Sequence, residues 1–263
     1  MRAALVVALV ALASPAHADP QADATKAFTT FLDSVAAKQA SADVDTFVSP
    51  FSDEQAATPE HLGEVAVLIQ GKPRVVAAAV AKSGTAAWIA AVVPGTLKLR
   101  ASAFLTLDKG AWHVRAAELS AGVANHKPAM CGSIEPWWKP PTNLIEEVVT
   151  VSKQLDAAMD SGTAKALVPL LSSDSHAQMF GSAPGEQWTG GTAIRRIFDK
   201  WQLDLDLEKS RRSGIAPGGD LMWLALSMSS TQQCTNYRVL MVLAKEGKSW
   251  KIVHQHYAEA LTR

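Results

Sequence analysis

The chain has 263 residues, of which 48% are hydrophobic, and its 25 Lys and Arg residues are balanced by 25 Asp and Glu residues. A balanced charge offers no basic surface of the kind that binds nucleic acid or anionic lipid, so we exclude both as partners. The length allows one large domain or two domains of ordinary size.

The first 18 residues have the organisation of a cleavable signal peptide. Arg2 supplies the positive charge, an apolar stretch follows over residues 3–13, and an A-x-A cleavage site ends at Ala18. We predict cleavage after Ala18, a periplasmic or secreted protein, and no stable membrane anchor. A transmembrane helix is the alternative, but it needs about 20 apolar residues and Pro15 interrupts this stretch.

Cys131 and Cys234 are the two cysteines of the chain. An oxidising compartment favours a disulfide between them, and two free thiols are the alternative. In the chain-entropy model, closing a loop of about 100 residues contributes about 4.7 kcal/mol. We therefore predict a Cys131–Cys234 disulfide.

Four prolines fall within residues 126–142, at positions 128, 136, 140 and 141. Proline removes a backbone donor and fixes φ, so this stretch is expected to form neither a helix nor a central strand. We predict a linker at residues 126–142, between a domain of residues 19–125 and a second domain of residues 143–263.

The second domain is predicted to place helices before strands. Asn143 is a good N-cap for a helix that extends to Met159. A short helix over residues 164–168 and a third helix from about Thr192 follow. From Asp220 onward, apolar segments alternate with turns and predict antiparallel strands, which gives an α+β order.

The first domain repeats this order in a reduced form. Its helix carries Phe28, Phe31 and Leu32 on one face, and strands are predicted at residues 64–70, 74–81, 86–93, 97–107 and 111–119.

Tryptophans recur at matching positions of the two domains. Trp88 and Trp112 correspond to Trp223 and Trp250. A functional aromatic cage has no need of duplication, so we predict that these side chains pack in the core.

The second domain resembles the SnoaL-like bacterial members of the NTF2-like superfamily over about residues 143–260. The segments that carry the resemblance are the helix at Leu155-Asp156, GGTAIRRIFDKW (190–201), GGDLMW (218–223) and SWKIVHQHY (249–257). The first domain resembles this group only through the internal repeat. The resemblance implies an α+β fold of two tandem cone-shaped NTF2-like domains, each with N-terminal helices packed on a curved antiparallel sheet. It implies a fold more strongly than a function.

The last strand carries the strongest candidates for chemistry, two histidines. Because side chains alternate along a strand, Trp250, Ile252, His254 and His256 are expected on one face, which we predict points into the second cone.

Three interpretations of His254 and His256 are open. They are structural and bond to backbone or carboxylate groups, or they line a ligand pocket with one as general acid or base, or they bind a metal. A metal needs a third ligand, for which only His176 or a nearby carboxylate is available, so we predict no metal site. The aligned residues of the first domain are Ala116 and Glu118, so such a site belongs to the second domain.

Three further residues complete the predicted ligand-binding set with these two histidines. His176 lies in the loop SSDSHAQMFG, where Asp174 either pairs with its imidazole or caps an exposed loop. Tyr237 begins a strand and is expected to point its hydroxyl inward. Trp188 is either a pocket lid or a surface anchor.

The sequence contains no phosphate-binding loop and no nucleophile elbow, and we expect no cofactor. The isomerases of the superfamily that the second domain resembles use a carboxylate base with a Tyr and an Asp, and this set has no match here.

We predict an exported, non-catalytic protein that binds a small apolar ligand or a protein partner, with its two sheets packed together within the chain in place of a homodimer. An isomerase- or dehydratase-type enzyme using His254 or His256 is the alternative. A purely structural pair of domains is the third hypothesis.

Overall fold

The computed structural model of the chain describes residues 19–39, 44–48, 63, 65–95, 97–123, 145–200, 206–230 and 235–259. The predicted signal peptide, the predicted linker at 126–142 and both cysteines of the predicted disulfide, Cys131 and Cys234, lie outside these residues.

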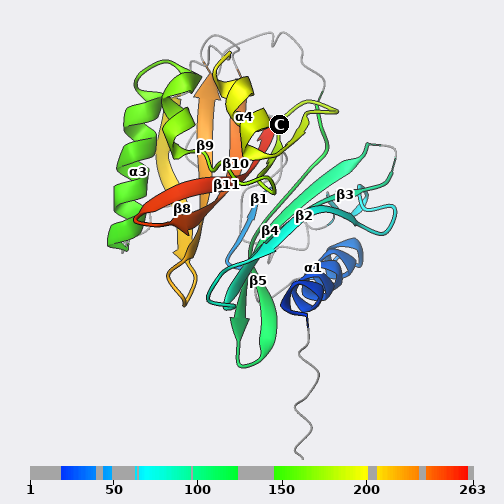
Figure 1. Ribbon diagram of the computed structural model, residues 1–263. Helices are drawn as coiled ribbons and strands as arrows, with labels where there is room; N and C mark the ends of the chain where they lie inside the picture. Colours follow the sequence, from blue (N-terminus) through cyan, green and yellow to red (C-terminus); the bar gives the residue numbers. More distant parts are fainter. Residues whose placement is uncertain are drawn as a thin grey trace, which may run out of the picture.

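The first part of the described chain is a helix and a five-stranded sheet, which we call sheet A (Figure 1). Helix α1 (Pro20–Ala36) is capped by Asp19, whose carboxylate accepts the Gln21 N–H at 3.0 Å. The strand order is β1-β5-β4-β3-β2, and β1 is parallel to β5 while the other pairs are antiparallel. The strands are β1 (Thr46–Val48), β2 (Arg74–Val80), β3 (Ala86–Val93), β4 (Leu99–Asp108) and β5 (Ala111–Ser120).

The second part forms a six-stranded sheet, sheet B, in the order β7-β6-β11-β10-β9-β8. Strand β6 is parallel to β11, and the other pairs are antiparallel. Its helices are α3 (Glu146–Met159), the 3-10 helix η1 (Ala164–Leu170) and α4 (Gly191–Phe198). Its strands are β6 (Gln178–Phe180), β7 (Gln187–Thr189), β8 (Asp206–Ile215), β9 (Leu221–Ser230), β10 (Thr235–Glu246) and β11 (Ser249–Glu259).

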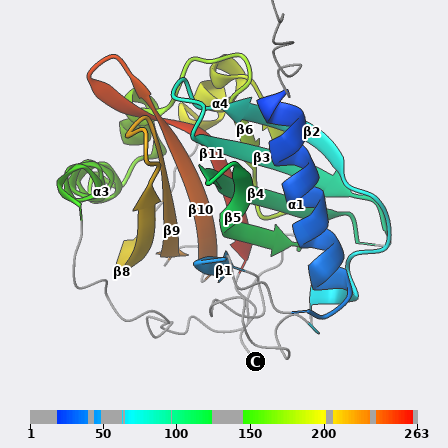
Figure 2. The same cartoon turned by 90° about the horizontal axis from the view of Figure 1, so that it is seen from below.

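The elements stack in layers, with α3 and α1 on the two outer sides and the sheets between them (Figure 2). One buried apolar cluster lies between α1 and sheet A. A second, the helix-side core, lies between sheet B and its helices. The third, the inter-sheet core, consists of Ala86, Trp88, Ala90, Phe104, Ala116, Phe180, Ala216, Leu221, Trp223, Ala225, Leu240, Val242 and Val253.

The two sheets share more than their strand order. Each has a row of paired residues that contributes to the contact between the sheets, namely Trp88, Phe104 and Ala116 in sheet A and Trp223, Val242 and His254 in sheet B. The strand register then shifts at the same point in both, next to Phe104 in β4 and next to Val242 in β10. The predicted packing of the recurring tryptophans is confirmed for Trp88 and Trp223, which are buried between the sheets.

The predicted α+β class, with helices packed on curved antiparallel sheets, is confirmed. Some predicted element bounds are wrong. Val65 and Ala66 are helical and buried, with Val65 in the α1 cluster, whereas Val67 is exposed, so the described residues of this run, 65–70, do not form the predicted strand. Helix α3 takes Ile145 as its N-cap residue instead of Asn143. Among the described residues, no helix has the length and apolarity needed to cross a bilayer.

Candidate functional site

A β-bulge in β11 decides where the candidate histidines point. Val253 has no partner in the β10 ladder, because the pairing passes from Ile252 directly to His254. Trp250 and Ile252 face the helix-side core, but beyond the bulge His254 and His256 face sheet A. The prediction that all four side chains point into the second cone is therefore wrong, since it assumed unbroken alternation along the strand.

Two serines of sheet A join the histidines in a continuous chain of hydrogen bonds, which we call the histidine–serine relay. Ser120 Oγ lies 2.8 Å from His256 Nε2, and His256 Nδ1 lies 2.9 Å from Ser102 Oγ. Ser102 Oγ lies 2.8 Å from His254 Nε2, and His254 Nδ1 lies 2.9 Å from the carbonyl oxygen of Gln178. All four ring nitrogens are thus bonded within the protein.

The direction of every bond in the relay follows from one carbonyl. The Gln178 oxygen can only accept, so His254 Nδ1 carries a proton and, in a neutral ring, Nε2 accepts. Ser102 then donates its one hydrogen to His254 Nε2 and accepts from His256 Nδ1. His256 Nε2 is left to accept from Ser120. Both imidazoles are satisfied when they are neutral.

Aromatic rings hold the two imidazoles in place. Trp88 stacks on His254 with ring centroids 5.1 Å apart and planes inclined by 10°. Phe180 presents its ring edge-on to His254 at 5.9 Å and to His256 at 5.2 Å. These aromatic rings keep water from the two imidazoles, and the loss of hydration disfavours their charged form.

Burial lowers the pKa of both histidines. His254 is 1% exposed and His256 is 0% exposed. Burial brings the pKa of His254 to about 3, against a raising effect of its bond to Gln178. Burial also lowers the pKa of His256 well below its ordinary value, with Arg100 and His254 acting in the same direction. Neither ring is poised to exchange protons near neutral pH.

A carboxyl group crosses the interface beside the relay. Glu118 is completely buried, and its Oε2 accepts the backbone N–H of Leu240 at 2.7 Å. Burial raises the pKa of Glu118 well above its usual value, while the Leu240 N–H and the guanidiniums of Arg100 and Arg238 oppose this rise. Among the described residues, Glu118 Oε1 has no hydrogen-bond partner.

Arg100 ties sheet A to the loop between β6 and β7. Its guanidinium donates to the carbonyl oxygens of Gly181, Ser182 and Ala183, the last two at 3.2 Å. Burial lowers the pKa of Arg100 to about 10, opposed by Glu118 and Glu186. The side chain therefore acts as a buried clamp between the two parts of the chain.

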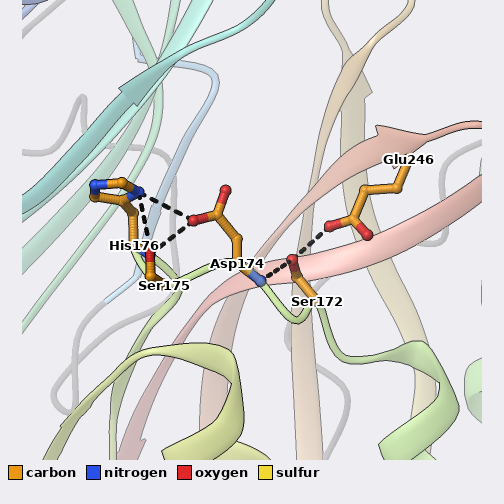
Figure 3. Close-up of polar contacts among 5 residues, drawn as sticks. All are labelled: Ser172, Asp174, Ser175, His176 and Glu246. Carbon is orange, nitrogen blue, oxygen red and sulfur yellow. Dashed lines mark hydrogen bonds and ion pairs between the residues drawn. The ribbon is translucent and has the colours of Figure 1, made fainter.

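The predicted Asp174–His176 pair forms at the surface of the loop between η1 and β6 (Figure 3). Asp174 Oδ1 lies 3.0 Å from His176 Nδ1 and accepts the His176 backbone N–H at 2.7 Å, which holds the pKa of Asp174 below its usual value. The His176 and Asp174 side chains are 77% and 53% exposed. Ser175 Oγ approaches the same Nδ1 at 3.5 Å, so these residues do not form a nucleophile–base–acid triad, which uses both ring nitrogens.

The same loop is anchored on its inner side by Ser172. Ser172 donates to Glu246 of the β10–β11 hairpin and accepts the Asp174 N–H at 3.0 Å (Figure 3). These bonds give the loop a structural role. Among the residues that the structure describes, no three His, Cys, Asp or Glu side chains are grouped as metal ligands.

The predicted ligand-binding residues are divided between the two faces of sheet B. Tyr237 and Trp188 are partly buried against the helix-side core, on β10 and on the edge strand β7. Burial is the main cause that raises the pKa of Tyr237 to about 12. His254 and His256 lie on the opposite face, and His176 is in solvent.

Sequence reasoning missed the residues that face the histidines. Ser102 lies two positions after Arg100 in β4, and Ser120 lies two positions after Glu118 in β5. Polar residues at i and i+2 near one end of each strand were a signal for one shared polar face. Tyr257 also follows the bulge, and its side chain lies in the helix-side core.

Comparison with known proteins identifies part of the chain. Residues 148–261 match a family model described as a SnoaL-like domain, which confirms the predicted resemblance of this part. No curated protein is detectably similar to the chain.

Three solved structures illustrate the likeness. A cystatin-like fold protein from Burkholderia xenovorans LB400 is 20% identical, with a TM-score of 0.35 over 44% of this chain and 92% of its own. An NTF2-like protein of unknown function from Pseudomonas putida KT2440 is 15% identical, with a TM-score of 0.35 over 43% of this chain and 83% of its own. An NTF2-like protein of unknown function from Shewanella oneidensis MR-1 is 11% identical, with a TM-score of 0.36 over 43% of this chain and 97% of its own. With TM-scores below 0.5, these likenesses carry no argument about activity.

Proposed function

We propose that this protein is an exported, non-catalytic binding protein. In this proposal residues 19–125 are a degenerate NTF2-like domain and residues 143–263 a SnoaL-like domain. Their sheets pair within the chain in place of a homodimer. The bound ligand is a small apolar molecule held in the helix-side core of the second domain.

The relay is the observation that carries the non-catalytic part of the proposal. An acid–base catalyst must reach its substrate and exchange protons near the working pH. His254 and His256 have all four ring nitrogens bonded between the sheets, and burial lowers the pKa of each. They therefore serve the contact between the sheets. This counts against the isomerase or dehydratase alternative.

The helix-side core is apolar and rich in methionine, so a ligand that entered it would be apolar. Thioether side chains are flexible and polarisable, so they adapt to the shape of what they contact. Tyr257 lies in the same core and donates its hydroxyl to Gln255 Oε1 at 2.7 Å, which adds one polar point. The core contains the methionines Met159, Met179, Met222, Met228 and Met241.

The pairing of the two sheets has the reciprocity of a two-fold interface. In such an interface residue i contacts j of the partner, and j contacts i. The shared register makes Glu118 equivalent to His256 and Ser102 equivalent to Leu240. His256 bonds to Ser102, and Glu118 bonds to Leu240, so the two contacts are the same contact exchanged.

The turns before β3 and β9 repeat this exchange. Asp220 accepts the Ser83 N–H at 2.7 Å, and Thr85 accepts the Gly218 N–H at 3.1 Å. Gly84 and Gly219, with φ of 71° and 67°, occupy equivalent places four residues before a tryptophan, so position 83 corresponds to 218 and 85 to 220. This second reciprocal contact supports a duplicated domain paired with itself.

A thermal-shift experiment on the mature protein tests the proposal, with 1-anilinonaphthalene-8-sulfonate as the apolar probe. His254→Ala and His256→Ala should each lower the unliganded melting temperature by several degrees and leave the probe-induced shift unchanged. A preserved melting temperature with a lost probe shift would instead place the imidazoles in the binding site. The mass of the protein recovered from the periplasm tests cleavage after Ala18.

A further inference from the structure

The two sheets differ in chemistry at their equivalent contact positions. His256 of sheet B forms hydrogen bonds with Ser102 and Ser120 of sheet A. The shared register assigns Leu240 and Ala258 of sheet B to the places of these two serines. The partners that the histidines need are thus present on sheet A and missing at the equivalent positions of sheet B.

We propose that the inter-sheet face of sheet B accepts sheet A and rejects a second copy of sheet B. The hydrogen bonds of the relay then determine which sheets can pair, and we call this requirement the pairing code. It keeps the two domains of one chain together and prevents the second domain from pairing with a second copy of itself. This inference rests on the intramolecular pairing in the proposed function and is independent of the ligand.

A second copy of sheet B would leave the histidines without partners. Leu240 would stand in place of Ser102, so His256 Nδ1 and His254 Nε2 would face a methyl group. Ala258 would stand in place of Ser120, so His256 Nε2 would also be orphaned. Buried polar atoms without partners are strongly disfavoured. Only His254 Nδ1 would keep its acceptor, because Gln178 belongs to the same sheet.

The apolar part of the interface does not discriminate in this way. Trp88 stacks on His254, and its equivalent Trp223 would offer the same ring in a second copy. Glu118 accepts a backbone N–H of Leu240, which every residue except proline supplies. Of the contacts made by the histidines, the two serine hydroxyls are therefore the ones that a second copy of sheet B would not supply.

The first test removes these hydroxyls in the full chain and measures urea unfolding by tryptophan fluorescence. Ser102→Ala with Ser120→Ala should lower the folding equilibrium constant by about a hundredfold, and Ser120→Ala alone by about tenfold. Ser227→Ala is the matched control, because Ser227 Oγ is buried without a hydrogen-bond partner among the described residues. It should change the constant by less than about twofold. If Ser120→Ala behaves like Ser227→Ala, the pairing code is refuted.

The second test introduces the same set of contacts with the two sheets exchanged, so that sheet A supplies the histidine and sheet B supplies the serines. Glu118→His alone should destabilise the chain, because the equivalence of the two sheets would place its ring against Leu240 and Ala258. Adding Leu240→Ser and Ala258→Ser should recover at least half of the lost folding constant, since these positions are equivalent to 102 and 120. Leu224→Ser, which faces the helix-side core, should give no recovery. Equal behaviour of the two combinations would overturn the equivalence.

Trp88→Ala separates failure of this inference from failure of the pairing itself. Trp88 lies in the inter-sheet core and outside the hydrogen-bonded relay. If Trp88→Ala lowers the unfolding free energy strongly and the serine variants do not, the pairing code is refuted but the two sheets still pair. If neither variant lowers the unfolding free energy, the sheets do not pair.

Discussion

Acid should destabilise this protein through its two buried histidines. The ordinary histidine pKa is about 6.5, whereas burial brings that of His254 to about 3. Below pH 6.5 the unfolded chain takes up a proton that the folded chain refuses. The stability contributed by the neutral ring is therefore present above pH 6.5 and is lost as the pH falls towards 3.

The size of this loss follows from linkage. Each pH unit below the unfolded pKa is worth about 1.4 kcal/mol for a group that stays neutral when folded. His254 alone should therefore remove about 2.5 kcal/mol of unfolding free energy between pH 6.5 and 4.5. His256 acts in the same direction, because its pKa is lowered too. A typical domain has only about 5–15 kcal/mol in total, so the loss is easily measured.

Glu118 acts with the opposite sign. Its folded pKa is raised, so the folded chain holds a proton that the unfolded chain releases above its ordinary pKa. The stability from Glu118 is present below pH 4.5 and is lost as the pH rises towards its folded pKa. It therefore offsets part of the histidine effect on acidification, and Glu118→Gln should make the acid loss steeper.

Urea unfolding at pH 6.5, 5.5 and 4.5 measures these slopes. His254→Gln with His256→Gln should flatten the pH dependence, even though the starting stability is lower. Ser227→Ala is the control, because it alters a buried side chain that does not titrate and should leave the slope unchanged. A double variant with the wild-type slope would refute the claim that these two rings are kept neutral by burial.

Three other predictions concern the contact between the sheets, each measured by urea unfolding. Trp88→Ala should cost about 3–5 kcal/mol, and Trp112→Ala less, because Trp112 is only partly buried. Gly218→Ala should destabilise the chain, because its Cβ would overlap the Ser83 side chain and lie 2.9 Å from Thr85 Oγ1. Arg100→Gln should cost about 1.5–3 kcal/mol, since it removes charged donors to the carbonyls after β6.

Hydrophobic pattern was sufficient for the helix α1, which buries one stripe, and for the central strands, which are buried on both faces and form continuous apolar runs. Strands β3, β4 and β5 were predicted within a few residues. Strand β8 was missed, since its sequence DLEKSRRSGI has no apolar alternation and sheet B pairs it as an edge strand. Short strands such as β6 are specified by their neighbours, which a single segment does not reveal.

The prediction of which face the two histidines occupy was wrong because of a single residue. The prediction placed His254 and His256 beside Trp250 because a strand has a period of two. Val253 adds one residue to the ladder, and a shift of one residue moves every later side chain to the other face. Nothing in SWKIVHQHY distinguishes a bulged strand from a regular one, so the face of the histidines could not be known from the sequence.

The bulge also explains why polar residues are retained in an otherwise apolar contact. The equivalent strand β5 shifts at the same row and so presents Glu118 to sheet B as β11 presents His256 to sheet A. In both strands the residues that would face a pocket in an unbulged sheet face the other sheet. The groups that resemble pocket chemistry in the sequence therefore lie between the two sheets, and the ligand we propose would be recognised by the helix-side face of sheet B.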